Sequence, residues 1–211
     1  ARETRVKSKI LSVGSSEQYG IVSRGSLPLV EKSPLNPISP YAVARVAQEE
    51  MSIIYTRGYN IPIICTRSFN HIGPRQSDVF AVSSFAKQIV EGRKGKRDKI
   101  ICGNLDVVRD FIDVRDAVCA YDLLLHKGKP GDVYNICSGR GHKLSDVLGL
   151  LQKIGVTRMP VEVNSALIRP MDNPIIIGSC AKLKKDTGFK AKYDISVSLG
   201  DMIDYWEEQL S

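Results

Sequence analysis

Two residues with complementary chemistry stand four positions apart, Tyr41 and Arg45. In a helix, side chains at this spacing lie on one face. A phenol titrates near ~10, so acid–base work at neutral pH requires a nearby positive charge that stabilises the phenolate. Arg45 can supply that charge, and the pair therefore predicts a proton-transfer site. The alternative for Tyr41 alone is a first-turn residue that packs on the preceding loop.

The sequence around the pair predicts a helix that begins beside Tyr41. Ser39 is a good N-cap residue and Pro40 suits the first helical position. Apolar residues continue at helical spacing through 41–55, and Gly58 is a plausible end of the helix.

Short apolar runs on both sides of this helix predict strands of a parallel sheet. The run 9–13 ends at small polar residues, 14–16, and α/β proteins place their sites at the carboxyl ends of parallel strands. The loop 20–40 is long and rich in proline, as functional or disordered loops are. Segment 69–75 has the composition of a polar turn. Further strands are predicted at 61–66, 99–102 and 133–137, and further helices at 79–91, 113–126, 145–154 and 196–209.

Composition excludes several classes of protein. The 211 residues are 43% hydrophobic and 25% charged, as in a globular protein of one or two domains. A net charge of +7 permits nucleic-acid binding, but acids interrupt the basic residues and aromatics do not recur among them, so a phosphate-bearing small ligand is favoured.

The cysteines and the apolar stretches indicate the cellular compartment of the protein. Five cysteines without CxxC spacing indicate buried thiols, and the scattered histidines predict no metal site. No apolar run could cross a membrane, and residues 1–9 lack the apolar core of a secretory signal. We therefore expect a cytoplasmic protein that binds neither membranes nor nucleic acid.

Three motifs resemble the extended short-chain dehydrogenase/reductase family, which is also called the NAD-dependent epimerase/dehydratase family. They are Gly-Ser-Ser-Glu-Gln-Tyr-Gly at 14–20, Ser-Pro-Tyr-x-x-x-Arg at 39–45 and Arg-x-Phe-Asn-His-x-Gly-Pro at 67–74. The runs 103–111 and 113–116 are similar to the GDP-sugar branch of that family. The combination is specific, whereas a lone tyrosine-cation pair would be weak.

The resemblance implies an α/β fold, the C-terminal part of a doubly wound Rossmann-type parallel sheet with a smaller α/β substrate-binding domain. Residues 1–70 would form the C-terminal half of the Rossmann-type domain and 71–211 mainly the substrate domain, with 113–137 returning to the Rossmann sheet. No glycine-rich turn follows a strand and opens a helix as dinucleotide binding requires. We therefore expect the chain to correspond to the C-terminal two-thirds of such an enzyme, with a helix end in 1–9.

The resemblance also assigns catalytic and cofactor roles. Ser15 would bond the sugar carbonyl, Tyr41 would donate the proton, and Glu17 stands where related dehydratases have a base. Arg45 replaces the lysine that contacts the cofactor ribose and lowers the tyrosine pKa. The implied cofactor is NADP(H), with NAD(H) as the alternative, contacted by Tyr41, Arg45 and His71.

For the substrate, the resemblance implies binding of a GDP-sugar. The residues it nominates are Asn70, Lys87, Gly103, Asn104, Arg109 and Arg169. Arginine can fork onto diphosphate oxygens, and lysine adds a point charge. The alternative for Arg109-Asp110 and Arg115-Asp116 is a solvated face of weak salt bridges.

The implied activity is reduction of the C4 ketone of GDP-4-keto-6-deoxy-D-mannose. GDP-mannose 4,6-dehydration and non-catalytic binding of a GDP-sugar are the alternatives. Relatives in this family pair through the helix that carries the tyrosine, so the resemblance also predicts a homodimer and an exposed apolar face on this helix.

Overall fold

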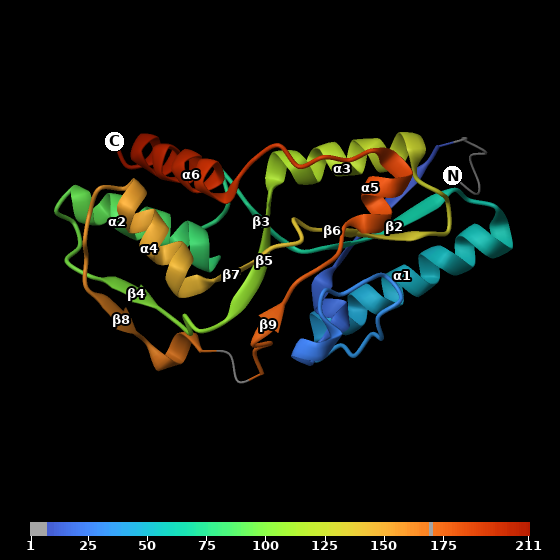
Figure 1. Ribbon diagram of the computed structural model, residues 1–211, viewed down its shortest axis with the longest axis horizontal. Helices are drawn as coiled ribbons and strands as arrows, with labels where there is room; N and C mark the ends of the chain where they lie inside the picture. Colours follow the sequence, from blue (N-terminus) through green and yellow to red (C-terminus); the bar gives the residue numbers. More distant parts are fainter. Residues whose placement is uncertain (1–7, 169–170) are drawn as a thin grey trace.

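The computed structural model describes residues 8–168 and 171–211 (Figure 1). Two predictions, a helix end in 1–9 and the role of Arg169, fall largely or wholly on residues 1–7 and 169–170, outside the described residues. No helix in the described ranges is long and apolar enough to cross a membrane.

Three parallel strands form the sheet that carries the Tyr41 region. β1 (Ile10–Ser15) pairs with β2 (Ile63–Ser68), and β2 pairs with β6 (Val133–Ile136). The α/β class, the parallel sheet and these three strands are confirmed. Ser15 aligns with Ser68, and Ser68 with Ile136, so the carboxyl ends of all three strands meet at one edge. Central β2 is buried at every residue, which explains why its first half, Ile63 to Cys65, is apolar.

Helices cover both faces of this sheet. Figure 1 shows α1 (Pro40–Tyr59) below it and α3 (Val114–Lys127) and α5 (Ala181–Thr187) above it. The start of α1 is as predicted, because the Ser39 side chain accepts from the Ala42 N–H at 3.1 Å. Its end is not at Gly58: the helix continues to Tyr59, and Asn60 adopts the left-handed cap conformation, which asparagine tolerates.

The other strands in the described residues form one sheet of four strands and one of two. β5 (Val108–Asp113) pairs with β3 (Asn70–Ile72), β7 (Gly141–Lys143) and β9 (Ile175–Ile176), while β4 (Ile100–Cys102) pairs with β8 (Val161–Val163). The expectation that 69–75 is only a polar turn is therefore wrong, because Asn70–Ile72 lies parallel to Phe111–Asp113. Three-residue strands are too short to show an alternating pattern.

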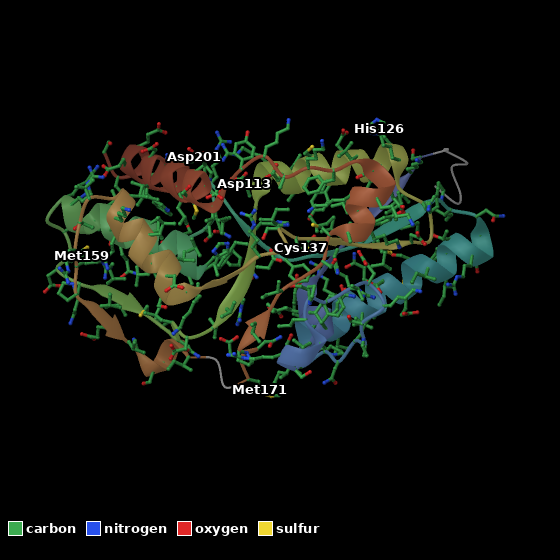
Figure 2. The ribbon with its side chains drawn as sticks, in the orientation of Figure 1. Asp113, His126, Cys137, Met159, Met171 and Asp201 are labelled. Carbon is green, nitrogen blue, oxygen red and sulfur yellow. The ribbon has the colours of Figure 1, made fainter. Side chains whose placement is uncertain are left out.

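Three helices close the other end of the molecule. They are α2 (Ala81–Arg93), α4 (Leu144–Ile154) and α6 (Ile195–Gln209), and Figure 1 shows them grouped away from α1. Short 3₁₀ helices occupy Ser16–Tyr19 (η1), Arg24–Ser26 (η2) and Ser165–Leu167 (η3). Arg115 joins α3 to α6, since its guanidinium bonds Asp113 at 2.8 Å and Asp201 at 2.7 Å, two carboxylates labelled in Figure 2.

Two clusters of buried hydrophobic residues form the core of the molecule. One is built on Ile64, Ile136 and Leu183 around the parallel sheet, and the other on Phe85, Leu148 and Met202 between α2, α4 and α6. Four cysteines are buried as expected, while Cys119 is half-buried. The domain boundary near residue 70 stays a prediction.

We predict that Gly20, which follows η1, is indispensable for this fold. Its φ is +66°, and a Cβ there would overlap the carbonyl oxygen of Asn36. Gly20→Ala should lower the free energy of unfolding by ~2–4 kcal/mol. Gly25 has open space around its Cβ position, so Gly25→Ala should change stability by less than about 0.5 kcal/mol. Urea unfolding of both variants measures the difference, and equal stabilities would contradict it.

Candidate active site

Ser15 ends β1 and caps η1. Its Oγ accepts from the Glu17 N–H at 3.2 Å, and its own N–H donates to Gln18 Oε1 at 3.0 Å. This reciprocal capping fixes the hydroxyl at the carboxyl end of the strand. Since Oγ accepts from a backbone N–H, its hydrogen can be donated to a ligand oxygen at this edge of the sheet.

Tyr41 and Arg45 lie beside this strand end. The Arg45 guanidinium carbon is 5.0 Å from the centroid of the Tyr41 ring, as the four-residue spacing predicted. Arg45 Nη1 donates to the carbonyl of Val13 at 3.2 Å and to Gln48 Oε1 at 2.7 Å. The Tyr41 side chain is 50% exposed, so its phenol is accessible to a ligand.

Glu17 also reaches the start of α1. Its Oε2 accepts from the Ser39 hydroxyl at 3.5 Å, and the Glu17 side chain is exposed. The carboxylate therefore lies between the Ser15 turn and the first turn of the Tyr41 helix.

A buried ion pair fixes α1 against the sheet. Arg67 bonds Glu49 twice, from Nη2 to Oε1 at 2.6 Å and from Nε to Oε2 at 2.9 Å, and both residues are at most 5% exposed. Burial opposes the charged guanidinium, but its bonds with Glu49 outweigh this and raise the pKa of Arg67. Gln18 Nε2 donates to the same carboxylate at 3.0 Å. One contact set thus joins α1, β2 and the turn that holds Ser15.

Tyr19 is part of the buried network around Arg67 and is not part of the Tyr41–Arg45 pair. Its hydroxyl donates to Asn135 Oδ1 at 2.7 Å and accepts from Arg67 Nη1 at 3.1 Å. Burial raises the pKa of Tyr19 to about 12, so it stays neutral.

Sequence reasoning missed this network, although one signal was present. Glu49 lies at helical spacing from Ala42, Val46 and Ile53, on the face of the helix that packs on the sheet. A carboxylate on a helix face that packs on the sheet requires a buried partner of opposite charge. Arg67, a charged residue in an otherwise uncharged strand, is that partner.

Asn70 and His71 lie on β3, where the chain leaves the parallel sheet. Asn70 Nδ2 donates to the backbone carbonyl of Asp110 at 3.2 Å. The His71 ring lies edge-on to Tyr121, with 3.5 Å between Nε2 and the phenol oxygen. Burial lowers the pKa of His71, so this imidazole is neutral at pH 7.

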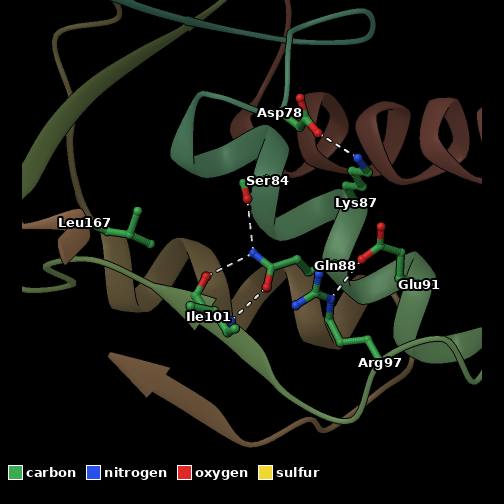
Figure 3. A pocket seen from close by; sticks show the side chains of 8 residues that line it. All are labelled: Asp78, Ser84, Lys87, Gln88, Glu91, Arg97, Ile101 and Leu167. Atoms are coloured by element: carbon green, nitrogen blue, oxygen red, sulfur yellow. Dashed lines mark hydrogen bonds and ion pairs between the residues drawn. The ribbon is translucent and has the colours of Figure 1, made fainter. Parts of the chain in front are cut away.

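Lys87 lines a pocket of about 250 Å³ between α2 and β4, drawn in Figure 3. Its ammonium bonds Asp78 Oδ2 at 2.7 Å and lies 5.3 Å from the Trp206 ring, so it already has partners within the chain. Gln88 spans the pocket and exchanges two hydrogen bonds with the Ile101 backbone.

Gly103 and Asn104 shape the loop that follows β4. A Cβ at Gly103 would lie 2.7 Å from the carbonyl oxygen of Leu167, so the glycine permits close approach of two backbones. Asn104 Oδ1 accepts from the Asp106 N–H at 2.9 Å. Both residues have a structural reason to be there.

Arg109 is connected to the Ser15 turn through one residue. It donates to Asp172 Oδ1 and to the carbonyl of Asn173, both at 2.6 Å, and Asn173 Nδ2 donates to the carbonyl of Gly20 at 2.6 Å. The structure thus brings Ser15, Tyr41, Arg45 and Arg109 into one connected region, whereas Lys87 lies in the pocket on α2.

The alternative of a solvated Arg–Asp face is wrong. Asp110 is 0% exposed and Asp116 is 2% exposed, and both accept hydrogen bonds from backbone N–H groups of distant segments. Arg109 pairs with Asp172 instead of Asp110.

Comparison with known proteins decides the family. The family described as GDP-mannose 4,6 dehydratase matches residues 1–202. The chain belongs to this family.

Individual relatives agree with the assignment. GDP-6-deoxy-D-mannose reductase of Pseudomonas aeruginosa is 35% identical over 203 residues, which cover 95% of this chain and 66% of the reductase. GDP-mannose 4,6 dehydratase 2 of Arabidopsis thaliana is 27% identical and is matched over 52% of its length. The chain therefore spans about two-thirds or less of these curated relatives.

Solved structures extend the likeness to the fold. The structure of RMD from Pseudomonas aeruginosa complexed with NADPH matches with a TM-score of 0.94 and 33% identity, over 98% of this chain and 69% of that one. UDP-glucose 4-epimerase of Thermotoga maritima matches with a TM-score of 0.89 and 26% identity, over 99% and 66%.

We predict strong coupling between Glu49 and Arg67. Glu49→Gln or Arg67→Gln alone should each lower the free energy of unfolding by ~3–5 kcal/mol, because each leaves a buried charge without its partner. The double variant should lose less than the sum of the two single losses. Denaturant unfolding of all four proteins measures the coupling. Strict additivity would show that the two side chains act independently.

The exposed pair of Lys99 and Glu162 is the matched control for this cycle. Its atoms are 2.7 Å apart, but water reaches both side chains. Glu162→Gln should therefore have a far smaller effect than Glu49→Gln.

Proposed function

We propose that this chain carries the catalytic and sugar-nucleotide-binding part of an NADPH-dependent reductase, which reduces the C4 ketone of GDP-4-keto-6-deoxy-D-mannose. The main support is a capped serine hydroxyl, Ser15, at the carboxyl edge of the sheet, on a turn whose Glu17 accepts from Ser39 at the start of the helix that carries the exposed Tyr41. The 35% identity to a GDP-6-deoxy-D-mannose reductase supports the same substrate class.

In this proposal Ser15 and Tyr41 share the carbonyl oxygen of the sugar. A bound NADPH would supply the hydride for the carbonyl carbon, and the negative charge that then develops on the oxygen would have to be stabilised by residues of the chain. Ser15 donates its hydroxyl hydrogen to that oxygen, while Tyr41 delivers the proton that completes the alcohol. The Arg45 cation, 5.0 Å from the ring, stabilises the phenolate that remains.

The donors of Arg45 fit a cofactor ribose. Both of its hydrogen bonds to the chain use Nη1. A guanidinium also carries N–H groups on Nη2 and Nε, which can donate to ribose hydroxyls. Tyr41, Arg45 and His71 would hold this end of NADPH, with NADH as the alternative cofactor.

Arg109 is the proposed contact for the GDP diphosphate. Its guanidinium is linked through Asn173 to Gly20, so a diphosphate near it would direct the sugar toward Ser15. Asn70 would bind the sugar or diphosphate, and Lys87, Gly103 and Asn104 would contact the GDP-sugar, as the family resemblance implied.

We predict that Tyr41→Phe lowers kcat by ~10²–10⁴-fold, because it removes the proton donor without removing the ring. Affinity for the substrate should change little. Tyr59 lies on the same helix, is 48% exposed and serves as the control, so Tyr59→Phe should leave kcat unchanged. NADPH oxidation by the complete gene product measures both. Equal kcat values for Tyr41→Phe and the parent protein would reject the assigned role.

Dehydration of GDP-mannose is the competing activity, favoured by Glu17 at the position of the dehydratase base. The complete gene product should consume NADPH with the 4-keto sugar and form no 4-keto product from GDP-mannose and NADP⁺. The opposite pair of results would establish the dehydratase instead.

A non-catalytic GDP-sugar-binding protein is the second candidate, favoured by arginine in place of the family lysine at position 45. Calorimetric titration with GDP-mannose and with NADPH separates the two. Heat from the sugar nucleotide alone would support the binding protein, whereas heat from both ligands supports the reductase.

We also propose that α1 contributes to a homodimer. Val43, Met51 and Ile54 are 54%, 58% and 61% exposed on this helix, although all three are apolar. Ile54→Glu should place a charge in the interface and shift the protein to a monomer in light scattering. Val79, 81% exposed in a turn, is the control, and Val79→Glu should keep the dimer. An Ile54→Glu dimer of parental affinity would exclude this interface.

A further inference from the structure

A second hollow, which we call the basic groove, contains neither Ser15, Tyr41 nor Arg45 in its lining. Its volume is about 690 Å³, within the ~300–1,000 Å³ that ligand sites occupy. Its walls come from Phe111 on β5, from segment 138–142 at the start of β7, from Lys184 on α5 and from segment 188–195 before and into α6. In Figure 1 the chain between α5 and α6 passes across α3.

Positive charge dominates the basic groove. Arg140, Lys184, Lys190 and Lys192 line it, against the single carboxylate of Asp194. Arg140 Nη1 lies 3.8 Å from that carboxylate. Within the described residues, Lys190 and Lys192 form no ion pair. Exposed lysines on a flat surface usually contribute little, but cations along a concave wall add their potentials.

Two buried carboxylates hold two segments of the groove wall in place. Asp116 accepts from the backbone N–H groups of Lys192 and Tyr193 at 3.0 Å. Asp110 accepts from the Ser138 N–H at 2.8 Å and the Gly139 N–H at 3.0 Å. Because these bonds fix the backbone of both segments, the cations project from an ordered frame.

The basic groove is distinct from the sites described above. It shares no lining residue with the Lys87 pocket, and neither Ser15 nor Tyr41 lines it. Arg109 does not line it, although its register partner His142 does, and the Arg109 guanidinium bonds Asp172 and Asn173 instead.

We propose that the basic groove binds a small molecule that carries two or more phosphate groups. Its cations come from three segments, so a single phosphate could not contact all of them at once, whereas linked phosphates could. Nucleic acid fits less well, because stacking of bases needs accessible rings. Phe189 is buried, and Tyr193, which is 37% exposed, already has Arg115 over its ring, with the guanidinium carbon 3.7 Å from the ring centroid. This inference does not depend on the proposed reductase activity.

The test is calorimetric titration of the complete gene product with inorganic pyrophosphate and tripolyphosphate, in the presence of saturating GDP. Lys190→Gln/Lys192→Gln should weaken tripolyphosphate binding about 10-fold or more, because two charge-assisted contacts are lost. The control is Lys32→Gln/Lys153→Gln, which removes the same charge from two exposed positions outside the groove. It should change affinity less than about 2-fold, as expected for distant screened charges.

Three results would overturn the proposal. Equal weakening by both double variants would mean that only net charge matters. Loss of polyphosphate binding under saturating GDP would place the phosphates in the sugar-nucleotide site. Tighter binding of a single-stranded RNA oligomer than of tripolyphosphate, at equal salt, would assign the groove to nucleic acid. Matching thermal unfolding of both double variants excludes misfolding as the cause.

Discussion

The buried pair of Glu49 and Arg67 is the interaction on which the candidate active site depends. Removing two charges from water is unfavourable unless their remaining hydrogen-bonding groups are satisfied. Here Gln18 and Tyr19 complete the set, with bonds of 3.0 and 3.1 Å. Because these residues lie on η1, α1 and β2, the bonds set the position of the Ser15 turn relative to the Tyr41 helix. The pair therefore serves geometry more than net stability.

Two buried aspartates, Asp110 and Asp116, likewise fix the positions of neighbouring segments elsewhere in the fold. Asp110 accepts four hydrogen bonds, from Ser138 N–H and Oγ–H and from the N–H groups of Gly139 and Gly178. Burial raises the pKa of Asp110, and these donors oppose that shift. Asp116 binds the segment before α6 in the same way. These two aspartates, one on β5 and one on α3, thus fix the backbone of loops that lie outside the strands.

The sequence was most informative where local patterns are strong. The β1, β2 and β6 strands and the start of α1 follow from apolar runs and from Ser39-Pro40, and the Tyr41–Arg45 contact follows from helical spacing. The strands β3, β7 and β9 could not be predicted, because two or three residues carry no pattern and form strands only through pairing with β5. The partners of Lys87 and Arg109 are likewise tertiary. Asp78 is nine residues from Lys87, and Asp172 is 63 residues from Arg109.

Arginine at position 45 illustrates how a motif can keep one physical function while it changes another. Stabilising a phenolate needs a positive charge near the ring, and the guanidinium of Arg45 provides it at 5.0 Å. The same group donates to the Val13 carbonyl on β1, so its planar shape lets it stack on Tyr41 and bond the strand at once. A compact ammonium can also lie over a ring while it bonds a partner, as Lys87 does with Trp206 and Asp78, but it has no flat face to lay on the ring. In the proposed function, Arg45 keeps the positive charge of the family lysine beside the phenol and differs from it in the donors that it offers to a ribose.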